Sequence, residues 1–119
     1  MKHLATLLLA LLLSAFAPAA GSADPLPPAE ASQHIGEAVL IEGVVSQVHY
    51  DKKSGNTFIN MGGRYPKHSF YAVIFREHAN LFPDVRSIEG QRVSIAGVVE
   101  LYRGKPQIVL RQASQLVVN

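Results

Sequence analysis

Residues 38–50, AVLIEGVVSQVHY, decide the fold class of this chain. The run is rich in β-branched residues, which favour strands, and Gly43 interrupts it near the middle. The pattern I-x-G-V-V that begins at Ile41 returns at residues 95–99 as IAGVV. A glycine inside a strand weakens the strand unless a bend or bulge is needed there. Small barrels need such bends, because a bent long strand can pair with two neighbours. Both stretches are therefore predicted to be strands that curl around a barrel.

The remaining chain adds further strands in an informative order. The predicted strands are residues 38–50, 56–61, 69–76, 91–102 and 107–111. Between the third and fourth strands, residues 77–82 are predicted to be a short helix that ends at Pro83. Another short helix is predicted for residues 28–36, where Pro28 suits the first position and Gly36 a left-handed stop.

The order of these elements indicates an all-β fold, the five-stranded Greek-key OB-fold barrel with a short helix between strands three and four. An SH3-like barrel is the main alternative, but it is not expected to place a helix there. In the fourth strand, alternation puts Val93, Ile95, Val99 and Leu101 on one face. Phe70 is expected in the core, together with Phe58 or Ile59.

The first 23 residues have the three parts of a secretory signal peptide. Lys2 gives the basic start, residues 4–16 are almost entirely Leu and Ala, and residues 18–23 are small and turn-prone. The signal peptide is expected to direct the protein to the periplasm or outside the cell, with cleavage after Ala23. The apolar run of about 13 residues is shorter than the roughly 20 that span a bilayer, so an uncleaved anchor is the less favoured alternative, and no membrane insertion is expected after cleavage.

The rest of the chain divides into two parts. Residues 24–30 contain three of the prolines and are predicted to be a flexible lead-in, and residues 31–119 form the predicted OB-fold domain. Without Lys2, the eleven basic residues become ten against nine acidic ones. So small a charge argues against strong non-specific coating of DNA.

The composition and motifs exclude several kinds of chemistry. Cysteine is absent, which excludes disulfides, thiolate metal sites and thiol nucleophiles. The histidines after residue 23 form no H-x-H or H-E-x-x-H pattern, so no metal or cofactor is expected. No G-x-S-x-G, paired carboxylates or phosphate-binding glycine loop is present, and the protein is predicted not to be an enzyme. The histidines are His34, His49, His68 and His78.

A binding face is nevertheless predicted. OB-folds bind ligands on the face of strands two and three, between the loop that joins strands one and two and the loop that joins strands four and five. Positive side chains and aromatic rings alternate in those segments, and single-stranded nucleic acid is bound by such cations and stacking rings. Asn60 either contacts a base edge or caps a turn. The predicted site residues are Tyr50, Lys52, Lys53, Asn60, Arg64, Tyr65, Lys67, Tyr71, Tyr102, Arg103 and Lys105.

Several segments also resemble those of a known family. They are His34-Ile-Gly36, Gly43-Val-Val45, Phe58-Ile-Asn-Met61, Tyr65-Pro66, Val73-Ile-Phe75, Glu89-Gly90 and Leu101-Tyr-Arg-Gly-Lys-Pro-Gln-Ile108. Over residues 31–116 the chain is similar to small bacterial exported OB-fold modules, grouped with nucleic-acid-binding OB domains of the tRNA-anticodon-binding type. This resemblance implies OB-type binding and supplies no catalytic residues, and together with the cations and rings above it favours single-stranded nucleic acid as the ligand. The alternative partner is an envelope protein, an oligosaccharide or a small anionic ligand, because the leader predicts export.

Overall fold

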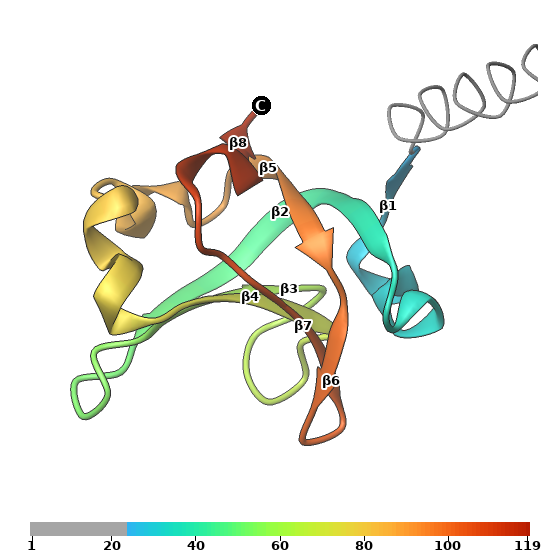
Figure 1. The fold of residues 1–119 in the computed structure, drawn as a ribbon, viewed down its shortest axis with the longest axis horizontal. Coiled ribbons are helices and arrows are strands. Elements are labelled where there is room, and N and C mark those ends of the chain that lie inside the picture. Colours follow the sequence, from blue (N-terminus) through green and yellow to red (C-terminus); the bar gives the residue numbers. More distant parts are fainter. Residues whose placement is uncertain (1–23) are drawn as a thin grey trace, which may run out of the picture.

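The computed structural model describes residues 24–119, and the predicted signal peptide lies outside them. The described part is mostly β, as predicted, with four short 3₁₀ helices (Figure 1). The strands are β1 (Pro25–Leu26), β2 (Ala38–Tyr50), β3 (Thr57–Met61), β4 (Phe70–Ile74), β5 (Arg92–Val98), β6 (Glu100–Tyr102), β7 (Lys105–Val109) and β8 (Leu116–Val118). The 3₁₀ helices are η1 (Pro28–His34), η2 (Arg76–Leu81), η3 (Val85–Ile88) and η4 (Ala113–Gln115).

The described strands pair along one path in the order β6-β7-β4-β3-β2-β5-β8, with β1 added beside β2. Pairs are antiparallel except β4 with β7 and β1 with β2. The all-β prediction is confirmed. The ladder does not give the predicted closed ring of five strands, because its ends are β6 and β8 and the predicted fourth strand is split.

Strand β2 bends and pairs with two neighbours, as the glycine pattern predicted. Its first half, up to Val44, pairs with β5, and from Val45 onward it pairs with β3, with a register shift between Val45 and Gln47. A Cβ added to Gly43 would lie 3.0 Å from Cδ of Pro28 and 3.3 Å from Cε of Met61. The missing side chain therefore lets η1 pack against the bend.

The second glycine pattern also marks a change of partner. β5 pairs with β2 up to Val98, and β6 pairs with β7 from Glu100 onward. Between them, Val99 is fully buried, and its backbone N–H donates to the Glu37 carbonyl at 3.0 Å. Its carbonyl accepts from the N–H of Gly36 at 2.7 Å. The loop before β2 thus takes the hydrogen bonds that would have continued the strand.

The inner faces of the strands share one apolar core. Phe70 and Ile59 are fully buried as expected, and Ala31 of η1 is buried in the same cluster. Val93, Ile95 and Val99 of the predicted fourth strand are fully buried, whereas Leu101 is 60% exposed, because β6 runs beyond the core after the break at Val99. Phe58 is only half-buried and packs in a second, smaller cluster on the outer face.

The predicted helices are present as tighter turns. Residues 28–34 form η1, the helix predicted for residues 77–82 is η2, and η3 forms after Pro83 in a segment that was predicted to be a connector. Pro83 in this connection cannot donate a backbone hydrogen bond, so one continuous helix is not favoured there. Within residues 24–119, no helix has the length and apolar character needed to cross a membrane.

Candidate functional site

The outer face of β2, β3, β4 and β7 carries two rows of side chains. Cross-strand register aligns His49 with Phe58, Phe58 with Val73, and Val73 with Val109. The second row runs from Gln47 through Asn60 and Tyr71 to Gln107. One row is therefore largely apolar and the other polar, and both lie on the side of the sheet away from the main core.

Five rings form a continuous series on this face, which we call the aromatic row. His49 stacks on Phe58 with ring centroids 6.3 Å apart, and Phe58 lies 5.8 Å from Tyr71. His68 meets Tyr71 edge to face at 5.6 Å and Tyr65 at 5.7 Å. Tyr71 and His68 in the middle are buried, whereas His49 and Tyr65 at the two ends are exposed. The row thus offers accessible ring surface at both ends.

Tyr65 and His68 belong to the loop of residues 62–69, and two sets of hydrogen bonds fix this loop on the sheet. On the β2 side, Oε1 of Gln47 accepts from the Tyr65 N–H at 2.9 Å and from Nδ2 of Asn60 at 3.0 Å. On the β7 side, Nζ of Lys105 donates to the carbonyls of Pro66, at 3.0 Å, and of His68. The loop is therefore held in place before any ligand arrives.

The centre of the row is electrostatically distinctive. Burial lowers the pKa of His68, and the nearby charge of Lys105 lowers it further, which favours a neutral ring. Its Nδ1 is buried without a hydrogen-bond partner. Burial raises the pKa of Tyr71, whose hydroxyl donates to Oε1 of Gln107 at 2.6 Å. Because the central rings are neutral, the positive charge around the aromatic row comes from the surrounding loops.

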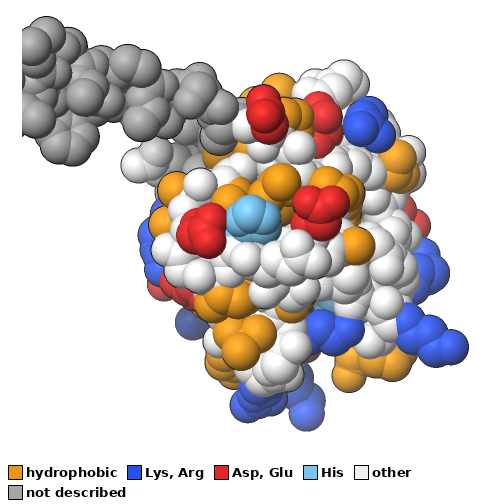
Figure 2. All heavy atoms as spheres, turned by 90° about the vertical axis from the view of Figure 1, so that its right-hand side faces the viewer, with side chains coloured by type: hydrophobic (Ala, Val, Ile, Leu, Met, Phe, Trp, Pro, Cys, Tyr) orange, Lys and Arg blue, Asp and Glu red, His pale blue; other side chains and the backbone are white. Residues whose placement is uncertain are grey.

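Those loops extend from one side of the sheet. The β2–β3, β3–β4 and β6–β7 loops all point toward the lower edge of Figure 1. Figure 2, turned about the vertical axis, shows Lys and Arg side chains at this lower edge, with others at the sides and the upper right, whereas most acidic side chains on that face lie higher. The exposed cations on these loops are Lys52, Lys53, Arg64, Lys67 and Arg103.

The predicted site residues divide into several groups. Tyr65, Tyr71, Asn60 and Lys105 lie on or over the outer face, but Asn60 and Lys105 serve there to hold Gln47 and the loop. Tyr50 lies elsewhere: it is the cross-strand partner of Thr57 and follows His49, so its ring is on the opposite face of β2.

Two other predicted residues also have partners within the chain. The Arg64 guanidinium donates to the Ser46 carbonyl at 3.2 Å and lies 3.7 Å from the Glu89 carboxylate. The exposed Tyr102 ring has the Arg103 guanidinium 5.2 Å from its centroid. These contacts orient both side chains while leaving them at the surface.

Sequence reasoning missed three members of the row: His49, Phe58 and His68. A period of two was the available signal for Phe58, because it lies two residues before Asn60 in the same strand and therefore on the same face. His68 gave no such signal, because its position depends on how the loop folds back. Among residues 24–119, no group of three or more His, Asp or Glu side chains is arranged to hold a metal ion.

The sequence matches no family model and no curated protein. Its fold is similar to that of an OBody bound to hen egg-white lysozyme, with a TM-score of 0.56 and 17% identity over 78% of this chain and 90% of that one. It is also similar to a putative aspartyl-tRNA synthetase from Leishmania major Friedlin, with a TM-score of 0.51 and 16% identity. That match covers 77% of this chain but only 20% of the synthetase.

An asparaginyl-tRNA synthetase from Entamoeba histolytica matches at a TM-score of 0.45 and 18% identity, over 82% of this chain and 24% of the synthetase. The first two likenesses and the strand order indicate an OB-type fold. At these identities the likeness concerns the fold alone.

Proposed function

We propose that this chain is an exported, non-catalytic OB-fold module that binds single-stranded nucleic acid across the aromatic row. The observation that carries the proposal is the series of five rings, 5.6–6.3 Å apart, bordered by loops with exposed cations. Rings that stack on bases and cations that follow the phosphates are the two components of sequence-tolerant single-strand binding. OB-fold nucleic-acid sites also lie on this face.

The two ends of the row would contact different nucleotides. One base stacks on His49 and Phe58, and another stacks on Tyr65, since the rings between them are buried. Each stacked base contributes about 1–3 kcal/mol. The phosphates lie near Lys52, Lys53, Lys67 and Arg103. Three or four phosphate contacts would give a slope of about −2 to −3 in the logarithm of affinity against the logarithm of salt concentration.

We further propose that β5 and β6 act as one interrupted strand, which completes a five-stranded Greek-key barrel. The parallel pairing of β4 with β7 and the antiparallel pairing of β6 with β7 support this arrangement, since together they place β7 between β4 and β6. In this arrangement β1 and β8 are additions to the barrel.

Fluorescence anisotropy with a labelled single-stranded oligonucleotide, at two salt concentrations, tests the proposed ligand. We expect Tyr65→Ala to weaken binding by about tenfold, as one lost stacked base implies, with little effect on folding because Tyr65 is 65% exposed. Tyr50→Ala is the matched control, because it removes an exposed ring on the opposite face of β2. No binding at low salt, or equal losses from both variants, refutes the proposed site. Binding of an envelope protein or oligosaccharide in its place would show that the alternative partner class is correct.

Export is tested separately. The protein is produced in a Gram-negative bacterium, and the mature chain is identified in the periplasmic fraction by mass spectrometry. We expect an amino terminus at Asp24. A full-length chain that stays in the cytoplasm contradicts this part of the proposal without affecting the nucleic-acid site.

A further inference from the structure

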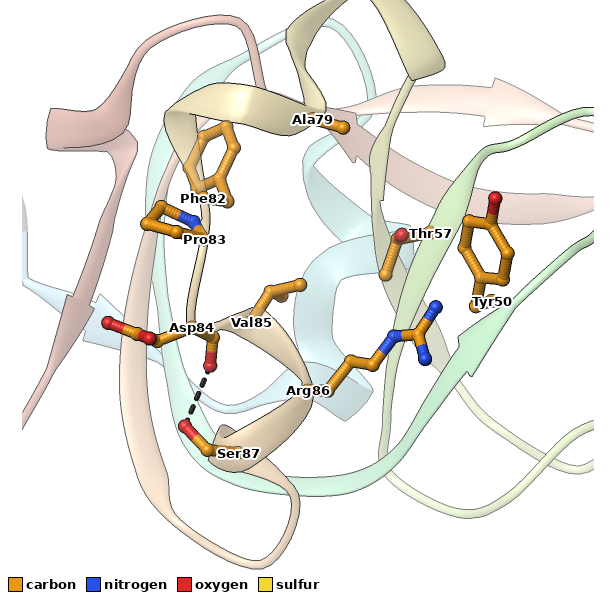
Figure 3. Close-up of a pocket in the computed structure, with 9 residues that line it drawn as sticks. All are labelled: Tyr50, Thr57, Ala79, Phe82, Pro83, Asp84, Val85, Arg86 and Ser87. Carbon is orange, nitrogen blue, oxygen red and sulfur yellow. Dashed lines mark hydrogen bonds between the residues drawn. The ribbon is translucent and has the colours of Figure 1, made fainter.

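A cavity lies at one end of the sheet, apart from the aromatic row. Its volume is about 370 Å³, and its walls come from the β2–β3 end and from the η2–η3 connection (Figure 3). Tyr50 and Thr57 are cross-strand partners, so both side chains lie on the same face of the β2–β3 pair and form one wall. Ligand pockets of small molecules usually begin at about 300 Å³ and often occupy the mouths of β-barrels.

The opposite wall of this cavity is mostly apolar. Phe82 and Val85 come from the two ends of the turn between η2 and η3, and Ala79 closes the upper side in Figure 3. Phe82 and Val85 also pack on the main core, which anchors this wall. A ligand there would place an apolar body against these side chains, as in most small-molecule sites.

One positive charge faces the cavity. The Arg86 guanidinium lies 4.6 Å from the centroid of the Tyr50 ring, and Figure 3 shows it directed between Tyr50 and Thr57. The ion pairs found within residues 24–119 do not include Arg86. Asp84 lines the same cavity, but its carboxylate is directed away from the interior in Figure 3. The Tyr50 ring therefore orients a guanidinium that has donors available for an anion.

We propose that this cavity binds a small organic anion, with a carboxylate or phosphate group on Arg86 and an apolar body against Phe82 and Val85. A guanidinium presents paired donors that fit the two oxygens of such a group. The Thr57 hydroxyl, on the same wall, is positioned to orient the polar end. The site is independent of the nucleic-acid proposal, because Tyr50 and His49 project from opposite faces of β2.

A comparison within the molecule makes the assignment specific. A second cavity of about 310 Å³ lies where β5 gives way to β6, and it is lined by Arg111 but also by Glu100. Each of the two cavities is therefore lined by one arginine and one carboxylate residue, and what differs is the ring that orients the arginine. Arg111 is the matched control for Arg86, because both are exposed arginines at the edge of a cavity, and Arg86 lies over the Tyr50 ring that directs it inward.

The test uses two-dimensional ¹H–¹⁵N NMR of the purified protein titrated with phenylacetate, phenyl phosphate and the uncharged phenylacetamide. For ligands of this size we expect dissociation constants on the order of 1 mM. The largest changes in amide chemical shift should occur at the residues that line the cavity, namely Tyr50, Thr57, Ala79, Val85 and Arg86. Arg86→Gln should weaken binding of the two anions by about tenfold, while Arg111→Gln and Tyr65→Ala leave it unchanged.

The outcomes separate the alternatives. Stronger binding of phenyl phosphate than of phenylacetate identifies a phosphate ligand, and the reverse order identifies a carboxylate; either supports the proposal. If phenylacetamide binds as well as the anions, or Arg86→Gln has no effect, the cavity is only an apolar hollow and the proposal is wrong. The proposal is also overturned if no localised chemical-shift change appears at a ligand concentration ten times the expected dissociation constant. This outcome counts whether or not oligonucleotides bind to the aromatic row.

Discussion

Replacement of Gly97 by alanine should destabilise this protein more than the corresponding change in β2. A Cβ at residue 97 would lie 2.5 Å from Cγ2 of Ile108 and 3.1 Å from Nε2 of Gln115. Ile108 is fully buried in β7, so it cannot move toward solvent. Overpacking of this kind costs about 1–3 kcal/mol. Movement of Gln115 would also weaken its hydrogen bonds to the carbonyls of Ala96 and Val109, at about 1 kcal/mol each.

The assay is urea unfolding followed by far-ultraviolet circular dichroism, since the chain has no tryptophan. We expect a loss of about 2–4 kcal/mol in the free energy of unfolding for Gly97→Ala. For Gly43→Ala we expect about 1 kcal/mol, because its closest contacts, Pro28 and the flexible Met61 side chain, lie at 3.0 and 3.3 Å. A double variant with Ile108→Ala should lose less than the sum of the two single changes. Equal losses at Gly97 and Gly43, or strict additivity with Ile108→Ala, would refute the close-approach argument.

Three further predictions concern the aromatic row. Lys105→Met should lower the free energy of unfolding by about 1 kcal/mol or more and should speed amide hydrogen exchange within residues 62–69. Unchanged exchange there would mean that Lys105 does not hold the loop. Tyr71→Phe should cost about 1–2 kcal/mol in urea unfolding, because it removes the donor to the buried Gln107; no loss contradicts this bond. The pKa of folded His68 lies below its ordinary value of 6.5, first through burial and then through Lys105. The unfolded chain therefore binds a proton first, and stability should fall as the pH drops below 6.5. His68→Asn should reduce this pH dependence, measured by thermal unfolding between pH 5 and 7, and an unaltered profile would assign it to another group.

The strongest features of the fold could be predicted from residue patterns. The bounds of β2 follow from its run of β-branched residues. Its change of partner follows from the I-x-G-V-V pattern, because a mid-strand glycine is costly unless the backbone needs it. The break at Val99 could not be predicted, because it depends on hydrogen bonds to Gly36 and Glu37, residues far away in the chain. Strand β8 was likewise missed, since a short apolar tail does not specify its partner.

The candidate site was harder to predict because residue type does not determine which face a side chain takes at a strand end or in a loop. Tyr50 and Lys105 have the chemistry of a nucleic-acid site. In the structure, however, Tyr50 lines the cavity that Phe82 and Arg86 also line, and Lys105 donates to loop carbonyls. His68 is the converse case: it lies in a polar loop of the sequence, yet that loop folds over Tyr71 and buries the imidazole.

The parallel pairing of β4 with β7 has a consequence for the folding pathway. The β2–β3–β4 meander joins strands that follow one another along the chain, whereas Tyr71 and Gln107 are separated by 36 positions. Closing such a long loop costs entropy before any contact compensates for it, so non-local pairings tend to form late. We expect the meander to assemble first and the Tyr71–Gln107 contact to appear only in the final step. The rings of the aromatic row lie within the meander, so they would come together early, whereas the hydrogen bonds from Gln107 and Lys105 of β7 would form last. Protection of the β7 amides as early as those of the meander, in pulse-labelling hydrogen exchange, would contradict this order.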